Sequence, residues 1–384
     1  MRSIYFLVVI LTCTVFSIHS EAAFMLKKTL TKEERDLLTN STEFNKKIGK
    51  QEWRLADRTM SDLLLDGLDV YGGELRNVDI LLTKMDNLHF RNFTFNKVRF
   101  HEGRIKNAIF ENVVFNDCEF ILEVIDSSKC IKCRFSGTTV ERGTGENSGY
   151  YNTEFQSHSE TQSSYRNMNF EDVKYINSKL TADYYDSIFK NYSLENVAGK
   201  MKYGSKSVAN FSIKGGDVDA SFYGEINYFI ATSAKSIKLK FGMESKVKSV
   251  KLSDIELVKE LIFAKNSTHE AIRIQNIKVL DEFTLGGEVK DLLLNNCNLM
   301  DSYFLFANIV NNVSFEKSPI KGLTIENSKL NGVKFIDSDI YDYLFVRNST
   351  LKDIEFRNSR VRAGTEIIDE NSQYSAGGKF PIER

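Results

Sequence analysis

The stretch Phe-Arg-Asn-Phe-Thr-Phe-Asn-Lys-Val-Arg-Phe (90–100) carries an apolar residue at every fifth position, and this period decides the fold. A second set of mostly small or apolar residues, such as Val98 and Ala108, stands two positions before each of these residues. A spacing of two puts both side chains on one face of a strand, so the other three residues must turn the chain. The same register holds, without a polar residue, through sixteen consecutive members. They are Leu65, Val70, Leu75, Ile80, Met85, Phe90, Phe95, Phe100, Ile105, Phe110, Phe115, Phe120, Ile125, Cys130, Phe135 and Val140.

The positions two residues after the large apolar ones carry residue types that favour turns. Asn and Asp tolerate left-handed backbone and bond their own backbone, and Gly has no steric barrier there. The period fits neither a helix nor an ordinary strand, so the sequence predicts short strands joined by corners in a solenoid. The corner residues are Gly72, Asn77, Asn87, Asn92, Asn107, Asn112 and Asp117.

Together with Ala-Ile-Phe-Glu-Asn-Val-Val-Phe-Asn-Asp-Cys-Glu-Phe (108–120), this pattern resembles the pentapeptide-repeat proteins. The resemblance implies an all-β fold, a single right-handed β-helix with four faces and about 20 residues per coil. The family favours Leu at the large position and Ala at the small one, whereas this chain prefers Phe and mixed residues. Irregular β-helices therefore match equally well.

The two ends of the chain differ in character from the repeat. Met1-Arg2, an apolar run over 4–18 and Ala22 at a cleavage position are typical of a secretory signal peptide. A capping box from Thr31 to Glu34 predicts a helical cap over the first coil. The predicted boundaries are a signal peptide over 1–22, a helical N-terminal cap over 23–60, regular β-helix over 61–180 with a polar loop at about 141–167, irregular β-helix over 181–290, regular β-helix over 291–362 and a flexible tail over 363–384.

Composition narrows the function classes. The 384 residues include 51 Lys+Arg and 52 Asp+Glu, which argues against a nucleic-acid partner. No second apolar run approaches the length of a bilayer span, so we expect a secreted, extracellular protein without a membrane span. Losing Cys13 with the signal peptide leaves four cysteines, which we expect in the core. A disulfide between Cys130 and Cys133 is the alternative.

No sequence motif indicates catalysis. The histidines are scattered, and no HExxH, GxSxG or phosphate-loop pattern occurs, so we expect no catalytic residues, no metal and no cofactor. Residues 200–251 hold ten lysines against four acidic residues. A basic strip there would suit an anionic glycan, and a solvated face is the alternative. The candidate binding residues are Lys235, Lys238, Lys240, Lys246, Lys248 and Lys251.

Seven Asn-x-Ser/Thr sequons are candidate N-glycosylation sites in a secreted protein, although an Asn-rich corner pattern also produces such triplets by accident. They begin at Asn40, Asn92, Asn191, Asn210, Asn266, Asn312 and Asn348.

These features predict a secreted, non-enzymatic protein that binds an extracellular protein or glycan over an extended β-helix surface. The signal peptide followed by a Phe- and Tyr-rich β-helix is also similar to secreted mosquito salivary β-helix proteins, which implies engagement of cuticle or host factors. Two alternatives remain. One is a bacterial pentapeptide-repeat effector or target mimic, and the other is a carbohydrate-active β-helix enzyme, which needs converging carboxylates.

Overall fold

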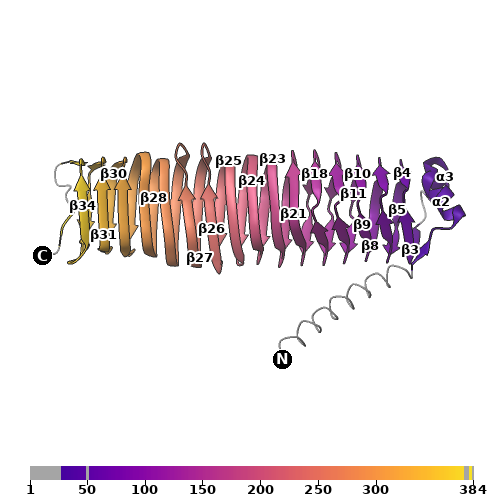
Figure 1. The fold of residues 1–384 in the computed structure, drawn as a ribbon, viewed down its shortest axis with the longest axis horizontal. Helices are drawn as coiled ribbons and strands as arrows, with labels where there is room; N and C mark the ends of the chain where they lie inside the picture. Colours follow the sequence, from indigo (N-terminus) through magenta and orange to yellow (C-terminus); the bar gives the residue numbers. More distant parts are fainter. Residues whose placement is uncertain (1–26, 49–51, 376–379, 383–384) are drawn as a thin grey trace, which may run out of the picture.

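The chain forms one right-handed β-helix of about 16 turns with two short helices at its N-terminal end (Figure 1). The structure is a computed structural model that describes residues 27–48, 52–375 and 380–382. It confirms the predicted all-β solenoid with a small helical N-terminal part. The predicted signal peptide lies outside the described residues. Among those described, no helix is long and apolar enough to cross a bilayer.

The N-terminal segments are β1 (Lys28–Thr29), α2 (Lys32–Thr39), α3 (Ser41–Ile48), β2 (Trp53–Ala56) and β3 (Arg58–Ser61). The coils that follow contain β4 (Leu64–Asp66), β5 (Asp69–Arg76), β6 (Asp79–Leu81), β7 (Lys84–Asp86), β8 (His89–Asn96), β9 (Arg99–His101), β10 (Arg104–Lys106), β11 (Ile109–Glu111), β12 (Val114–Asn116), β13 (Glu119–Ile121), β14 (Val124–Asp126), β15 (Lys129–Ile131), β16 (Arg134–Ser136), β17 (Thr139–Glu141), β18 (Thr144–Glu146), β19 (Gly149–Tyr151), β20 (Glu154–Gln156), β21 (Ser159–Arg166) and β22 (Asn169–Ile176).

Longer strands then take over, namely β23 (Lys179–Glu195), β24 (Ala198–Lys214), β25 (Asp217–Thr232), β26 (Ser236–Phe241), β27 (Lys246–Phe263) and β28 (Thr268–Glu316). The C-terminal coils contain β29 (Ile320–Glu326), β30 (Lys329–Ile336), β31 (Ile340–Arg347), β32 (Thr350–Lys352), β33 (Glu355–Arg357), β34 (Glu366–Glu370) and β35 (Gln373–Tyr374).

Stacked phenylalanines fill the regular coils. Phe95, Phe115 and Phe135 are register partners in parallel strands, twenty residues apart. Their ring centroids lie 4.9 and 4.5 Å apart with nearly parallel planes. Each ring therefore covers the one in the coil before it, and burying this aromatic area is the main source of stability.

The corners between the short strands hold the expected left-handed residues. Asn87 and Asn112, for example, have φ values of 55° and 54°. Their side chains also form ladders along the axis, because Asn112 Nδ2 donates to Asn92 Oδ1 at 2.6 Å and Asn107 Nδ2 donates to Asn87 Oδ1 at 3.2 Å. The corner amides thus bond between coils as well as shaping each turn.

The polar segment 141–167 is not the loop or disturbed coil that its composition suggested. It continues the stack through β17 to β21, and its residues pair in register with the coils on both sides. Backbone N–H and C=O groups carry the ladder whatever the side chain, so Gly145 and Glu160 occupy inward positions that are apolar elsewhere. Ser, Gly and Thr changed the composition without breaking the coil.

The helical cap ends earlier than the predicted boundary at residue 60. Trp53 and Leu55 belong to β2, which pairs with β5 as part of the first coil. The Phe44 ring of α3 meets Trp53 edge-on at 5.3 Å, and Trp53 stacks on Phe93 at 5.9 Å. The two helices therefore cover the open end of the core, which would otherwise expose an unpaired strand edge.

The segment 363–384, predicted to be a flexible tail, contains the last coil instead. β34 pairs with β31, β35 pairs with β32, and Ile382 bridges to Val361. The Phe380 ring packs at 5.5 Å from Phe356. The segment looked loose because a terminal coil has a neighbour on one side only and carries more polar residues.

From β23 onward one corner is missing. Glu160 pairs with Leu180 and Ser163 pairs with Ala182, so the corner residue Gln162 has no counterpart in the next coil. Rungs then repeat every nineteen residues, from Lys179 through Ala198 to Asp217. Without the corner, two short strands fuse into one extended strand.

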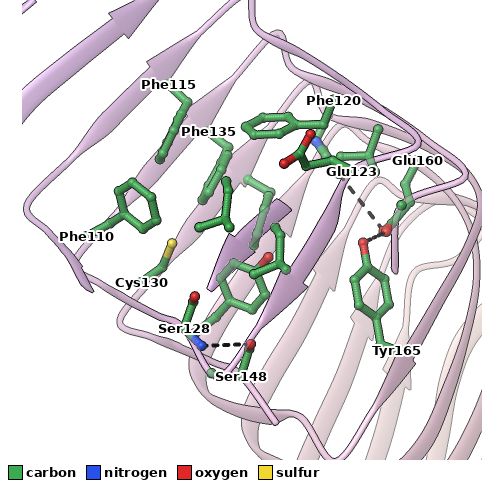
Figure 2. A pocket seen from close by; sticks show the side chains of 18 of the residues that line it. Phe110, Phe115, Phe120, Glu123, Ser128, Cys130, Phe135, Ser148, Glu160 and Tyr165 are labelled. Atoms are coloured by element: carbon green, nitrogen blue, oxygen red, sulfur yellow. Dashed lines mark hydrogen bonds and ion pairs between the residues drawn. The ribbon is translucent and has the colours of Figure 1, made fainter. Parts of the chain in front are cut away.

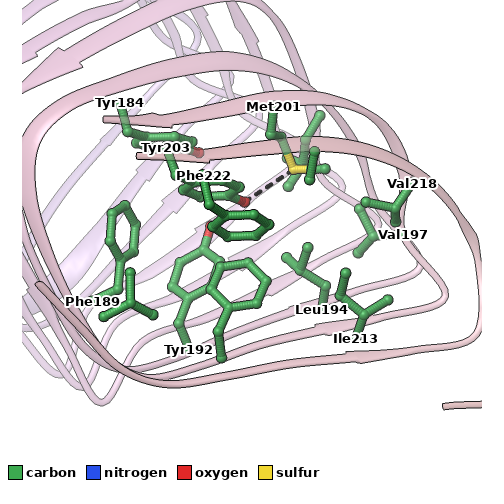
Figure 3. Close-up of a cluster of buried hydrophobic side chains, with 14 of the residues drawn as sticks. Tyr184, Phe189, Tyr192, Leu194, Val197, Met201, Tyr203, Ile213, Val218 and Phe222 are labelled. Atoms are coloured by element: carbon green, nitrogen blue, oxygen red, sulfur yellow. Dashed lines mark hydrogen bonds between the residues drawn. The ribbon is translucent and has the colours of Figure 1, made fainter. Parts of the chain in front are cut away.

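The core of the fused coils is tightly filled by tyrosine and phenylalanine (Figure 3). Tyr184, Tyr203 and Phe222 stack from coil to coil at centroid distances of 5.1 and 4.9 Å. All three side chains are fully buried. The interior therefore stays close-packed where the outline of the coil changes.

Candidate functional site

The fused strands create an outer surface that we call the flat face. It consists of the outward residues that are register partners from one rung to the next. Alternation puts these residues opposite the buried ones, so four columns run along the axis. The columns are Lys179, Ala198, Asp217, Ser236 and Leu257; Thr181, Lys200, Asp219, Lys238 and Glu260; Asp183, Lys202, Ser221, Lys240 and Ile262; and Tyr185, Gly204, Tyr223, Gly242 and Ala264.

Charges in the second column of the flat face alternate in sign from rung to rung. In the second column, Lys200 is followed by Asp219, Lys238 and Glu260. Lys238 Nζ lies 2.5 Å from Glu260 Oε1, and this hydrogen bond raises the pKa of Lys238. The flat face is therefore a banded surface, where each lysine rung lies between rungs that carry acidic or neutral residues.

The structure divides the six candidate lysines between several places. Lys238 and Lys240 lie on the flat face, and Lys235 lies just before it. The turn at Gly242–Ser245 separates them from the remaining three, which belong to β27. Of those three, Lys246 Nζ lies 3.8 Å from Glu225 Oε1. The predicted strip is thus not one continuous surface, and its binding role stays a prediction.

Sequence analysis missed several members of the flat face. Lys200, Lys202, Tyr185 and Tyr223 were not selected, because clustering along the chain was the only signal used. A repeat of nineteen residues relates Lys200, Asp219 and Lys238. A search of the sequence for a nineteen-residue repeat, in addition to the five-residue repeat, would have found the columns of the flat face.

A cavity of about 50 Å³ lies inside the regular coils (Figure 2). It forms where Gly143 and Gly145 occupy inward positions that carry larger side chains in other coils. A Cβ at Gly145 would lie 2.6 Å from Tyr165 Cδ1, so the Tyr165 ring of the next coil occupies part of the space that a larger side chain would fill. The wall is mostly aromatic, with Glu123 and Glu160 at its edge.

The two interior carboxyl groups are shifted toward the neutral form. Burial raises the pKa of Glu123 to about 8 and that of Glu160 to about 7. Glu123 Oε2 accepts a hydrogen bond from the Gly103 amide at 3.0 Å, whereas Oε1 has no partner. Glu160 accepts from the Tyr165 hydroxyl.

A buried histidine completes the interior polar group. His158 Nδ1 lies 2.7 Å from Thr138 Oγ1, and burial lowers the pKa of His158 to about 3. His158 is therefore neutral at physiological pH, and it lies among core side chains rather than at a substrate surface. In the described part of the chain, no group of three or more His, Cys, Asp or Glu side chains is placed to hold a metal ion.

Within residues 27–48, 52–375 and 380–382, the four cysteines Cys118, Cys130, Cys133 and Cys297 are free and buried in the core. The alternative disulfide is not formed. Cys130 lies in the column between Phe110 and Tyr150, whereas Cys133 belongs to the next inward column and its Sγ lies 3.4 Å from the Phe110 carbonyl oxygen. Burial is the main cause that raises the pKa of the Cys130 thiol well above its usual value.

All seven sequon asparagines are exposed. Several of them use their amide nitrogen in the corner ladders: Asn191 Nδ2 donates to Asp172 at 2.7 Å and Asn312 Nδ2 donates to Asp291 at 2.9 Å. A glycan on such a nitrogen would compete with the ladder, whereas Asn266 lies in a turn outside it. Which sequons carry sugar stays a prediction.

The coils form a β-helix that resembles the pentapeptide-repeat proteins, because left-handed corners separate short strands. No family model and no curated protein matches the chain. Among solved structures it is similar to HetL, a pentapeptide repeat protein involved in heterocyst differentiation regulation from the cyanobacterium Nostoc, at 10% identity and a TM-score of 0.34, over 57% of this chain and 87% of that one.

Two further solved structures match more weakly. QnrB1, a plasmid-mediated fluoroquinolone resistance protein, matches at 8% identity and a TM-score of 0.18, over 40% of this chain and 82% of that one. The alginate lyase AlyGC matches at 8% identity and a TM-score of 0.16, over 90% of this chain and 98% of that one. At these values none of the matches bears on what the chain binds. The narrower likeness to mosquito salivary proteins gains no support from them.

Proposed function

We propose that this chain is a secreted, non-enzymatic binding protein that holds an extracellular partner on the flat face. The observation that carries the proposal is the fusion of two strands per coil into one continuous, rigid surface with columns of Lys, Asp and Tyr. Backbone pairing on both sides fixes each rung, so binding would cost little conformational entropy.

The arrangement of acidic groups supports binding rather than hydrolysis. Glu123 and Glu160 face the interior. On the surface, Asp337 accepts from Asn358 Nδ2 at 3.2 Å and Asp339 forms an ion pair with Arg362. A glycosidase needs two carboxyl groups that face one sugar from opposite sides, and these residues are already engaged as corner and edge contacts.

The test uses four lysines of the flat face against four others. Replacing Lys200, Lys202, Lys238 and Lys240 by Ser should leave the thermal midpoint close to wild type, because exposed substitutions usually change stability by less than about 0.5 kcal/mol each. The same change should lower the salt needed to elute the protein from a heparin column. The control replaces Lys235, Lys246, Lys248 and Lys251 by Ser and removes the same charge from other surfaces. Equal elution of both variants would contradict the flat face as the binding surface.

A second candidate is a pentapeptide-repeat effector or target mimic. The regular coils support it, because they offer a four-sided rod whose outer columns are set by a strict twenty-residue repeat. A partner of this kind would be held by the regular coils and not by the flat face. Capture of a partner that is unaffected by the flat-face lysine variant, but lost when Arg91, Arg104 and Arg134 are replaced by Ser, would favour this candidate.

A further inference from the structure

We propose that Tyr185 and Tyr223, with Gly204 and Gly242 between and beside them, form a tyrosine platform for an extended acidic polysaccharide. This inference rests on the proposed function, since the platform is one edge of the flat face. It names the chemical class of the partner and the direction in which the partner lies, along the axis of the β-helix.

The Tyr223 ring lies down on the sheet because Gly242 makes room for it, and the Tyr185 ring borders Gly204. A Cβ at Gly242 would overlap the Tyr223 ring at Cδ1 and Cε1, so that ring covers the backbone of the next rung. A Cβ at Gly204 would lie 3.7 Å from Tyr185 Cδ1, which is ordinary van der Waals contact, so the Tyr185 ring lies beside Gly204 and its hydroxyl reaches Asp183 on the same strand. A ring that covers backbone with one face offers the other face to solvent, and Tyr223 is half-buried while Tyr185 is 37% exposed. Flat, rigid aromatic surfaces bind apolar faces of ligands at low entropic cost.

The spacing of the two rings favours a polymer over a single sugar. Tyr185 and Tyr223 are two rungs apart, with Gly204 between them, which corresponds to about 9.6 Å at strand spacing. A disaccharide in an extended β-linked chain has a comparable length, so alternate sugar rings would meet successive tyrosines. Lys202 and Lys240, in the neighbouring column, repeat with the same two-rung period.

The charges around the platform favour an acidic chain. Arg166 is the register partner of Tyr185 in the preceding coil, and Lys202 and Lys240 are exposed beside the glycines. Of the acidic neighbours, Asp183 has its Oδ2 engaged at 3.1 Å by the Tyr185 hydroxyl, Glu225 Oε1 lies 3.8 Å from Lys246 Nζ, and Asp186 follows Tyr185 at an exposed corner. Carboxylate or sulfate groups on the polymer would meet these cations while its sugar rings stack on the tyrosines.

The experiment measures binding of hyaluronan and polymannuronate oligosaccharides, two acidic chains with β-linkages, by calorimetry, with dextran as the uncharged probe. The variant Tyr185→Ala/Tyr223→Ala should bind the better of the two acidic probes about tenfold more weakly than wild type, as two lost aromatic contacts imply. Tyr228→Ala is the matched control, because Tyr228 is on the same strand and 53% exposed but lies outside the platform. It should bind as wild type does.

A second variant protects the test against misfolding. Gly242 has no left-handed φ and an added Cβ there meets only the Tyr223 ring, so Gly242→Ala should weaken binding while its thermal midpoint stays near wild type. Wild-type affinity in the double tyrosine variant overturns the platform. If the lysine variant of the flat face loses binding in the same assay, the proposed function stands without the platform. Binding of dextran as tight as that of the acidic probes overturns the acidic partner.

Discussion

The regular coils over 53–178 and the fused coils over 179–241 use the same chain in two ways. In the first, a left-handed corner residue follows each short strand, and rungs repeat every twenty residues. In the second, one corner residue is absent, rungs repeat every nineteen residues, and two faces become one. The loss of one corner residue between β21 and β23 therefore converts two narrow faces of the coil into one wider face.

The interiors differ as well. The regular coils tolerate a cavity, two interior carboxyl groups and a buried histidine, whereas tyrosine and phenylalanine rings fill the fused coils (Figures 2 and 3). Polar residues are tolerated inside the regular coils because every rung is held by backbone hydrogen bonds on both sides. The difference implies that packing stabilises both regions, and that interior titratable groups add a pH dependence in the regular coils.

The largest expected effect is the loss of one stacked ring in either region. Phe115→Ala and Phe222→Ala should each lower the free energy of unfolding by about 3–5 kcal/mol, because both rings are buried between two others. Denaturant unfolding measures the loss, and hydrogen exchange shows which region loses protection. Thr94→Ala and Ser221→Ala are the outward controls and should change stability by less than about 0.5 kcal/mol. A Phe115→Ala loss no larger than that of its control would contradict the inward register.

The second effect is a pH dependence from four interior groups. Burial raises the pKa of Glu123 and Glu160 from 4.5 to about 8 and about 7, and it lowers the pKa of His158 and His269 from 6.5 to about 3. Between pH 3 and 4.5 the unfolded chain binds more protons, because its histidines are charged, so stability rises with pH. Between pH 4.5 and 6.5 the effect of the two glutamates on stability is opposite to that of the two histidines, so the two effects cancel. Above 6.5 the folded chain holds more protons, so stability falls, at about 1.4 kcal/mol per pH unit for each carboxyl group.

Two double variants distinguish the contribution of the glutamates from that of the histidines. Glu123→Gln/Glu160→Gln should abolish the decline between pH 6.5 and 8, measured by denaturant midpoints at each pH. His158→Gln/His269→Gln is the complementary control: it should retain that decline and extend it down to pH 4.5. A decline above pH 6.5 that persists in the double glutamine variant would show that the interior acids are not its source.

The smallest effect concerns corners that hold an unsuitable residue. Leu82 and Leu122 have φ values of 49° and 53° and are 52% and 41% exposed. Replacing each by Asn should stabilise the protein by about 1 kcal/mol, because a left-handed backbone penalises a leucine more than an asparagine. Leu64→Asn is the control, since Leu64 is an exposed leucine in β4 rather than at a corner. Equal effects at all three positions would attribute the gain to polarity and not to the corner.

Sequence reasoning identified the solenoid because its evidence is periodic. Inward residues such as Phe95 and corners such as Asn112 recur at fixed spacing, and backbone pairing preserves that spacing in space. It failed at 141–167, because it judged the core by composition although Gly145 and Glu160 keep the register. The flat face was missed because the next coil lacks a residue equivalent to Gln162, and the absence of one corner residue does not change the composition.

The change from twenty to nineteen residues per coil can be measured directly with paired cysteines. Cα atoms of register partners are about 4.8 Å apart, within the range that a disulfide spans. We predict that Ser221→Cys/Lys240→Cys cross-links, and that Thr94→Cys/Val114→Cys does so in the regular coils. The native thiols should stay silent, since burial raises the pKa of Cys118 to about 12 and that of Cys297 to about 11. Cross-linking of Ser221→Cys/Phe241→Cys in place of the first pair would contradict the account.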